Sequence, residues 1–136
     1  QYVGGDMKLN LFLLLGMLFL HLVDDYYLQG WLASAKQKSW WEKNASEELY
    51  SHDYIMALCE HAFSWTFMIM LIPTVFNYVC NHNIPVDYFL FFALNWTIHS
   101  IVDDLKANKK DINLVQDQLF HIIQIILTWY ALIIIR

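Results

Sequence analysis

Histidine and aspartate recur in this sequence as pairs spaced four residues apart. The pairs are His21 with Asp25, His99 with Asp103 and, in reverse order, Asp117 with His121. Side chains four residues apart lie on one face of an α-helix, about one turn from each other. Each pair could therefore direct an imidazole and a carboxylate towards the same point.

A fourth apolar segment adds Glu60 and His61 to these pairs. The last pair has the reverse order, with aspartate before histidine. Two consecutive helices that run antiparallel cross the same level in opposite directions, so this reversal is what places both pairs at one level. We therefore expect all four segments to bring ionisable groups to the same level of a helical bundle.

Imidazole nitrogens and carboxylate oxygens are common protein ligands of Zn, Mn and Fe. Helical bundles build metal sites from such residues on facing helices. We expect one or two ions of a divalent transition metal, with Zn favoured and Mn or Fe as alternatives. The expected metal ligands are His21, Asp25, His61, His99, Asp103, Asp117 and His121.

Two other interpretations of the same residues stay open. The imidazoles and carboxylates could form a metal-free network that fixes the packing of the helices. They could also conduct protons or cations. Buried ionisable groups in a membrane are costly unless they are paired, hydrated or bound to an ion, so each interpretation requires the groups to meet.

The composition indicates the elements that position these groups. The chain has 136 residues, of which 58% are hydrophobic, and it contains four apolar stretches at 9–23, 54–79, 86–102 and 119–135. A helix needs roughly 20 residues to cross a membrane. We predict an all-α, up-down-up-down bundle of four transmembrane helices at about 8–32, 50–80, 85–106 and 112–135, in one integral membrane domain at 8–136. Residues 1–7 are expected to be a flexible or cloning-derived leader.

Charge distribution predicts the orientation of the bundle. Six of the eight positive residues lie in the two loops that an up-down bundle places on one side, which indicates the cytoplasmic side. Both termini are then extracytoplasmic. The polar segment 34–53, with Trp40 and Trp41, is expected to lie at the cytoplasmic interface as a helix or loop. The net charge of −5 gives no reason to expect a nucleic-acid partner.

These residues suggest a membrane-embedded, metal-dependent hydrolase that acts on a lipid-linked or membrane-delivered ester, with a phosphoester favoured. Glu60 or Asp104 could accept a proton as general base. Lys106, one turn after Asp103, could hold a phosphate or lipid headgroup, although it could equally be a membrane-flanking charge. Gln29 and other glutamines could orient the ligands.

The alternative is a small non-enzymatic membrane protein, of bacterial or phage origin, whose polar ring is structural. Such a protein would act by oligomerising or by binding other membrane proteins. In either case, membrane lipid is an expected partner.

The combined motifs resemble a known family. They are His21-x-x-x-Asp25-Tyr26-x-Leu28-Gln29, His61, His99-x-x-x-Asp103-x-x-Lys106 and Asp117-Gln118-x-x-His121. This order resembles DUF3307, a domain-of-unknown-function family of small bacterial and phage membrane proteins. The resemblance extends from about Lys8 to Tyr130 and implies a multi-pass protein of the bacterial inner membrane with the same polar residues. The acidic, Trp-rich first loop and the His52–Asp53 pair depart from the family pattern.

Overall fold

The computed structural model describes residues 6–135, which are almost entirely helical. This part of the chain contains no β-strand, and the all-α prediction is confirmed. The α-helices are α1 (Met7–Leu22), α2 (Leu32–Ala35), α3 (Lys38–Asn44), α4 (Asp53–Asn81), α5 (Val86–Asp104) and α6 (Leu114–Trp129). Three π-helical segments, η1 (Val23–Leu28), η3 (Leu105–Lys109) and η4 (Tyr130–Ile134), continue α1, α5 and α6, and η2 (Glu48–Tyr50) is a 3₁₀ turn. Residues 1–5 of the predicted leader at 1–7 lie outside the described residues, and so does Arg136.

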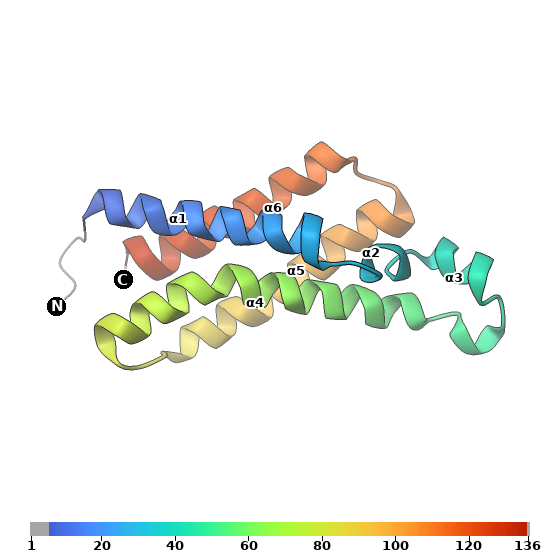
Figure 1. Cartoon of the computed structure of the whole chain (residues 1–136), viewed down its shortest axis with the longest axis horizontal. Coiled ribbons are helices and arrows are strands. Elements are labelled where there is room, and N and C mark those ends of the chain that lie inside the picture. Colours follow the sequence, from blue (N-terminus) through green and yellow to red (C-terminus); the bar gives the residue numbers. More distant parts are fainter. Residues whose placement is uncertain (1–5, 136) are drawn as a thin grey trace.

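Four long helical stretches determine the shape of the molecule (Figure 1). In space, α1 contacts α4 and α6, and α5 contacts the same two helices, so the four stretches surround a common interior. The short helices α2 and α3 pack against one end of α4. The start of α1 and the end of η4 lie together at the opposite end of the molecule (Figure 1).

Polar residues are concentrated inside and many apolar residues face outwards. The side chains of Phe12, Phe19 and Leu127 are 70%, 63% and 61% exposed, whereas four histidines and four aspartates are buried. Three helical stretches are long and apolar enough to cross a membrane, Met7–Leu28, Glu48–Asn81 and Leu114–Ile134. The predicted crossing at 85–106 forms α5 but does not meet this measure, because polar residues interrupt its apolar sequence.

The first helix ends earlier than the sequence pattern predicted. Its helical path stops at Leu28 rather than near residue 32, because Gly30 adopts a positive φ of 50° that a helix does not tolerate. The chain then turns back into α2. Lys36 follows that helix directly and is therefore carried into the interior of the bundle.

A capping box fixes the start of the last long helix. The Asn113 side chain accepts a hydrogen bond from the Gln116 backbone N–H at 3.0 Å, and the Asn113 N–H donates to the Gln116 side chain at 2.9 Å. Asp117 and His121 follow one and two turns later and are both fully buried. The cap therefore sets the register that turns both side chains inwards.

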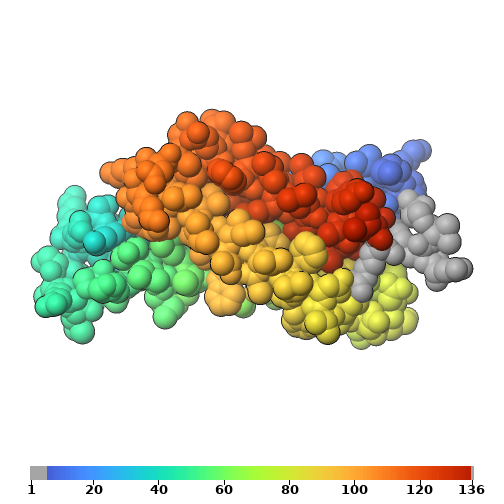
Figure 2. All heavy atoms as spheres, turned by 180° about the vertical axis from the view of Figure 1, so that it is seen from behind, coloured from blue at the N-terminus to red at the C-terminus, as the bar shows by residue number. Residues whose placement is uncertain are grey.

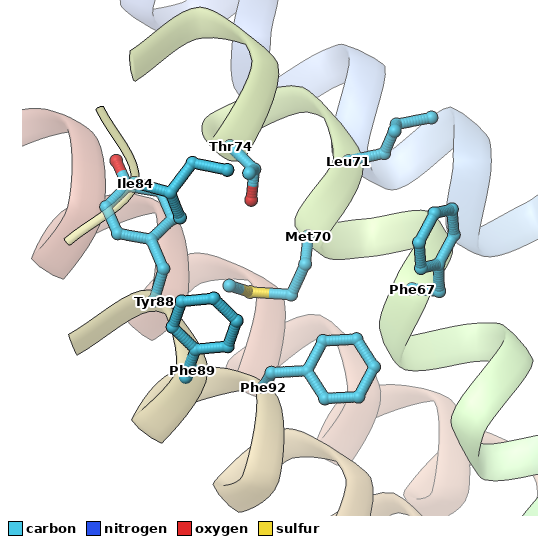
Figure 3. A pocket seen from close by; sticks show the side chains of 8 residues that line it. All are labelled: Phe67, Met70, Leu71, Thr74, Ile84, Tyr88, Phe89 and Phe92. Atoms are coloured by element: carbon cyan, nitrogen blue, oxygen red, sulfur yellow. The ribbon is translucent and has the colours of Figure 1, made fainter. Parts of the chain in front are cut away.

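A hydrophobic core adjoins the polar residues of the interior. It contains Met17, Trp65, Ile69 and Ile125, all fully buried. An apolar pocket of about 250 Å³ lies between α4 and α5 (Figure 3). Its lining side chains are Phe67, Met70, Leu71, Thr74, Ile84, Tyr88, Phe89 and Phe92. None of these residues is an acid or a histidine, so the pocket offers no charged metal ligand.

The segment after the first helix carries an aromatic cluster. Trp40 and Trp41 pack edge to face with ring centroids 5.0 Å apart, and Trp31 contacts both rings. The Trp41 indole N–H donates to the Ala35 carbonyl at 2.7 Å, which ties α3 to α2. This part of the chain lies at one end of the elongated molecule, away from the C-terminal residues (Figure 2). Such rings favour the headgroup region of a bilayer.

Gly16 of α1 faces the side chain of Ile72 on α4. A Cβ atom at this position would overlap Ile72 Cδ1 of α4. We expect Gly16→Leu to lower the free energy of unfolding in detergent by about 1–3 kcal/mol, because overpacking forces the helices apart. Unfolding followed by circular dichroism measures the effect. Phe12→Leu, on the exposed face of the same helix, is the control and should change little; equal losses would contradict the close contact.

Candidate metal centre

All seven predicted metal ligands are buried in the interior. Six of them form one cluster of imidazoles and carboxylates, and four of these six have no exposed surface at all. The six are Asp25, His61, His99, Asp103, Asp117 and His121. They come from η1, α4, α5 and α6, so separate helices converge on one level as the sequence pattern requires.

Within this cluster two groups of three residues are compact enough to hold a metal ion. The first ligand group is Asp25, His61 and His99, and the second ligand group is His99, Asp103 and His121. In each group one ligand atom per residue lies within 4.8 Å of the other two. These buried histidines and aspartates could therefore hold a metal ion.

The distances in the first ligand group match those around a bound ion. His61 Nε2 lies 3.3 Å from Asp25 Oδ1 and 3.3 Å from His99 Nε2. A tetrahedral ion with ligands at about 2.0–2.2 Å separates neighbouring ligand atoms by about 3.3–3.6 Å. Asp103 Oδ2 is also 3.3 Å from His61 Nε2, so a further carboxylate adjoins this group.

The second ligand group is slightly more open. Asp103 Oδ1 lies 3.4 Å from His121 Nε2 and 3.7 Å from His99 Nε2. Asp117 Oδ1 approaches the same His121 nitrogen to 3.3 Å. Among residues 6–135 no hydrogen-bond partner reaches either Asp117 Oδ1 or His121 Nε2, although both atoms are buried. Unsatisfied buried polar atoms are rare and call for an explanation such as an ion.

Two lysines enter the cluster from its open end. Lys36 Nζ lies 2.6 Å from Asp103 Oδ2, and Lys106 Nζ lies 2.7 Å from Asp117 Oδ2. Burial alone would lower the pKa of Lys106, but the hydrogen bond and charge of Asp117 raise that pKa above its ordinary value. The Lys106 ammonium therefore stays charged at neutral pH. Each lysine neutralises one buried carboxylate.

His21 is adjacent to both ligand groups but has no nitrogen free to bind an ion. The Trp65 indole N–H, which can only donate, donates to His21 Nδ1 at 2.7 Å. The His21 proton is therefore on Nε2, which donates to Gln118 Oε1 at 3.0 Å. Gln118 Nε2 in turn donates to Asp25 Oδ2 and Asp117 Oδ2, each at 3.1 Å. His21 thus orients two carboxylates of the cluster through Gln118.

The π-helical turn η1 brings two adjacent aspartates inside. A regular helix would turn Asp24 about 100° away from Asp25, but both side chains are buried here. Ser64 donates to Asp24 Oδ1 at 2.5 Å, and Asp24 Oδ2 lies 3.9 Å from His61 Nδ1. At 3.9 Å this is a contact between charges and not a hydrogen bond, and neither Asp24 Oδ2 nor His61 Nδ1 has a hydrogen-bond partner among the described residues. No sequence pattern signals the wider turn.

A second set of amides adjoins His121 on its other side. Gln124 Nε2 donates to the backbone carbonyl of Asn95 at 3.2 Å and to Asn95 Oδ1 at 3.1 Å. Asn95 Nδ2 donates to Thr128 Oγ1 at 2.8 Å. These bonds leave Gln124 Oε1 facing His121 Nδ1 at 3.3 Å. The expected orienting role of glutamines thus has a structural basis at Gln118 and Gln124.

Two predicted catalytic residues are not brought to the cluster. Glu60 is exposed on α4 and does not face the interior, although its neighbour His61 does. Asp104 accepts a hydrogen bond from Asn108 Nδ2 at 2.8 Å and lies 3.8 Å from Lys109 Nζ, outside the cluster. Neither carboxylate can serve as a general base in the cluster. Adjacent residues of a helix point about 100° apart, so each carboxylate faces away from the cluster while the neighbouring ligand faces inwards.

A small polar pocket connects the cluster to the outside. It has a volume of about 80 Å³. Its lining residues are Asp25, Tyr26, Gln29, Lys36, Asp103, Lys106, Leu114 and Gln118. The pocket therefore exposes carboxylates of both ligand groups beside two ammonium groups. Reasoning from spacing alone missed Lys36 as a site residue, because it lies beyond the break at Gly30.

Comparison with known proteins gives one match. The family model described as "Protein of unknown function (DUF3307)" matches residues 13–136, which confirms the resemblance inferred from the motifs. No curated protein and no solved structure matches the chain.

The buried ion pair between Lys36 and Asp103 should be essential to the fold of the metal-free protein. We expect Lys36→Met to lower the free energy of unfolding by about 3–5 kcal/mol, because it leaves the Asp103 carboxylate buried without its partner. Denaturant unfolding in detergent with a chelator measures this. The matched control is Lys38→Met, whose ammonium lies 3.9 Å from Glu42 on the exposed surface. It should change stability by less than about 0.5 kcal/mol, and similar losses in both variants would show that the buried pair has no special role.

Proposed function

The chain belongs to the DUF3307 family of proteins of unknown function, and from this premise we propose that it is a membrane-embedded, metal-dependent hydrolase. Its proposed substrate is a lipid-linked or membrane-delivered phosphoester. The observation that carries the proposal is the convergence of buried imidazoles and carboxylates from four helical stretches beside a pocket lined by two lysines.

The first ligand group is the proposed binding site for a divalent ion, with Zn favoured over Mn or Fe. Its nitrogen and oxygen donors and their separations suit a tetrahedral ion. When bound, such an ion makes a water molecule a better nucleophile at neutral pH and polarises a phosphoryl oxygen. Gln118 would orient Asp25 through its hydrogen bond, and Asp24 would place a second negative charge near His61.

Proton transfer is assigned to His121 with Asp117. These side chains lie 3.3 Å apart, next to Asp103, and neither belongs to the first ligand group. An imidazole paired with a carboxylate is the usual arrangement for a general base or acid. This assignment replaces Glu60 and Asp104, which face away from the cluster.

Lys36 and Lys106 would bind the anionic part of the substrate. Both lysines line the polar pocket. Each lysine carries three donors, and its aspartate takes up one. The remaining donors could bind phosphate oxygens.

The proposed setting is the bacterial inner membrane, crossed four times, with α5 as the fourth crossing. Burial of α5 among the other helices would shield the polar residues that lower its hydropathy. The elements α3 and η3 carry four lysines, and Lys36 and Lys110 directly flank α2 and η3. These segments lie at one end of the molecule, and the start of α1 and the end of η4 lie at the other (Figure 1). The excess of lysines favours a cytoplasmic location for the site and extracytoplasmic termini.

A structural role is the second candidate, and one observation favours it. Lys36 and Lys106 already neutralise Asp103 and Asp117, so part of the buried charge is compensated within the chain. Protons on two imidazoles could compensate the rest. A bundle stabilised in this way could act by oligomerising or by binding another membrane protein.

Assay of purified protein distinguishes the two functions. The protein is purified in detergent, analysed for bound metal and incubated with mixed micelles that contain phosphatidic acid or a polyprenyl diphosphate. We expect near-stoichiometric metal and release of inorganic phosphate that a chelator abolishes. Asp25→Asn should lower the rate at least about 100-fold, because it removes a proposed ligand. Lys106→Met should raise KM more than it lowers kcat, because it removes a charge that binds the substrate.

The control is Asp111→Asn, which replaces an exposed aspartate outside the cluster and should keep full activity. Folded protein that contains no metal and releases no phosphate from either lipid would contradict the hydrolase and favour the structural role.

A further inference from the structure

An outer groove lies between the start of α4 and the end of α5. It has a volume of about 270 Å³. Its lining residues are Tyr54, Ile55, Leu58, Cys59, Ser100, Ile101, Asp104 and Lys109. None of these residues is a proposed metal ligand, and none of them also lines the polar pocket beside the candidate metal centre. The proposed hydrolase therefore gives the outer groove no role.

Most of the lining of the outer groove is apolar. Leu58 is buried, whereas Ile55 of α4 and Ile101 of α5 are 45% and 55% exposed. The Trp96 indole N–H donates to the Cys59 carbonyl at 2.9 Å, which joins the two helices beside the groove. An alkyl chain in the groove would contact these apolar side chains without removing a charged group from water.

A loose ion pair lies at one end of the outer groove. Lys109 Nζ is 3.8 Å from Asp104 Oδ2, which is too long for a hydrogen bond. The Lys109 side chain is 59% exposed and the Asp104 side chain is 27% exposed. Exposed ion pairs contribute little to stability, so both groups can exchange this contact for the charges of a ligand.

The ion pair lies at the level expected for lipid headgroups. The start of α4 and the end of α5 lie at the same end of the molecule as α3, whose Trp40 and Trp41 favour the headgroup region (Figure 1). Leu58 and Ile101 lie about one helical turn further into the bundle. The outer groove therefore runs from a charged level into an apolar one, as a phospholipid does.

We propose that the outer groove binds a phospholipid whose headgroup carries both a phosphate and an ammonium group. Lys109 donates to the phosphate, Asp104 accepts from the headgroup ammonium, and one acyl chain follows the apolar lining. An anionic headgroup would pair with Lys109 alone and would place its negative charge beside the Asp104 carboxylate. The two opposite charges therefore select a zwitterionic lipid. This site is separate from the proposed hydrolase centre and requires only that the chain lies in a membrane.

Cysteine alkylation tests this lipid site, because Cys59 lines the outer groove and Cys80 is exposed near the other end of α4. Full-length protein in detergent is treated with N-ethylmaleimide, and mass spectrometry follows each cysteine as dioctanoyl phosphatidylethanolamine is added. At a lipid concentration about ten times the Kd, alkylation of Cys59 should be about tenfold slower, since only free groove reacts. Alkylation of Cys80 is the internal control and should not change.

Charge variants test the headgroup contacts. Lys109→Gln and Asp104→Asn should each weaken the protection of Cys59 at least about threefold, because each removes one charged partner. Asp104→Asn should also abolish the preference over dioctanoyl phosphatidylglycerol. The matched controls are Lys110→Gln and Asp111→Asn, which replace exposed residues outside the groove and should match the wild type. Size-exclusion chromatography and circular dichroism check that each variant is folded.

Native mass spectrometry counts bound lipid independently of alkylation. One phosphatidylethanolamine per wild-type chain is expected, and none on the folded double variant Lys109→Gln/Asp104→Asn. Equal binding of phosphatidylglycerol to the wild type would refute the selection of a zwitterionic headgroup. Undiminished binding to the double variant, or no binding to the wild type, would refute the site itself. None of these results bears on the proposed metal centre, whose failure appears separately as folded protein without metal.

Discussion

The structure depends on one constraint, which is that charge buried in the interior must be compensated. The outer surface of the bundle is largely apolar, so its polar groups are directed inwards, where water cannot solvate them. Each buried carboxylate must therefore find a cation or a hydrogen-bond donor. Lys36 and Lys106 compensate two of them, and Gln118 and Ser64 donate to others. The rest of the charge requires protons or an ion.

Irregular backbone supplies much of this compensation. The π-helical turn η1 buries Asp24 beside Asp25, so that one aspartate faces His61 Nε2 and the other approaches His61 Nδ1. The turn at Gly30 folds α2 back and delivers Lys36 to Asp103. The π-helical segment η3 carries Lys106 towards Asp117. Departures from regular α-helix therefore cluster around the candidate site, as they often do at functional sites.

Sequence spacing predicted the part of the site that regular helices determine. His99 and Asp103 share a helical face, and so do Asp117 and His121, because side chains four residues apart lie on the same face of an α-helix. The all-α class followed from the apolar stretches for the same reason. Lys36 could not be found in this way, since its position depends on how the chain folds back after Gly30. The metal-ligand role expected of His21 conflicts with its hydrogen bond from Trp65, a partner 44 residues away that no local pattern reveals.

These imidazoles and carboxylates are proposed to bind a common ion. X-ray absorption at the zinc edge, on detergent-purified protein carrying zinc, tests this binding most directly. We expect nitrogen and oxygen ligands at about 2.0–2.2 Å, with the outer-shell scattering that is diagnostic of coordinated imidazole rings. A shell of water oxygens alone would contradict it, as would a sulfur ligand at about 2.3 Å from Cys59 or Cys80, because either would place the ion outside the cluster.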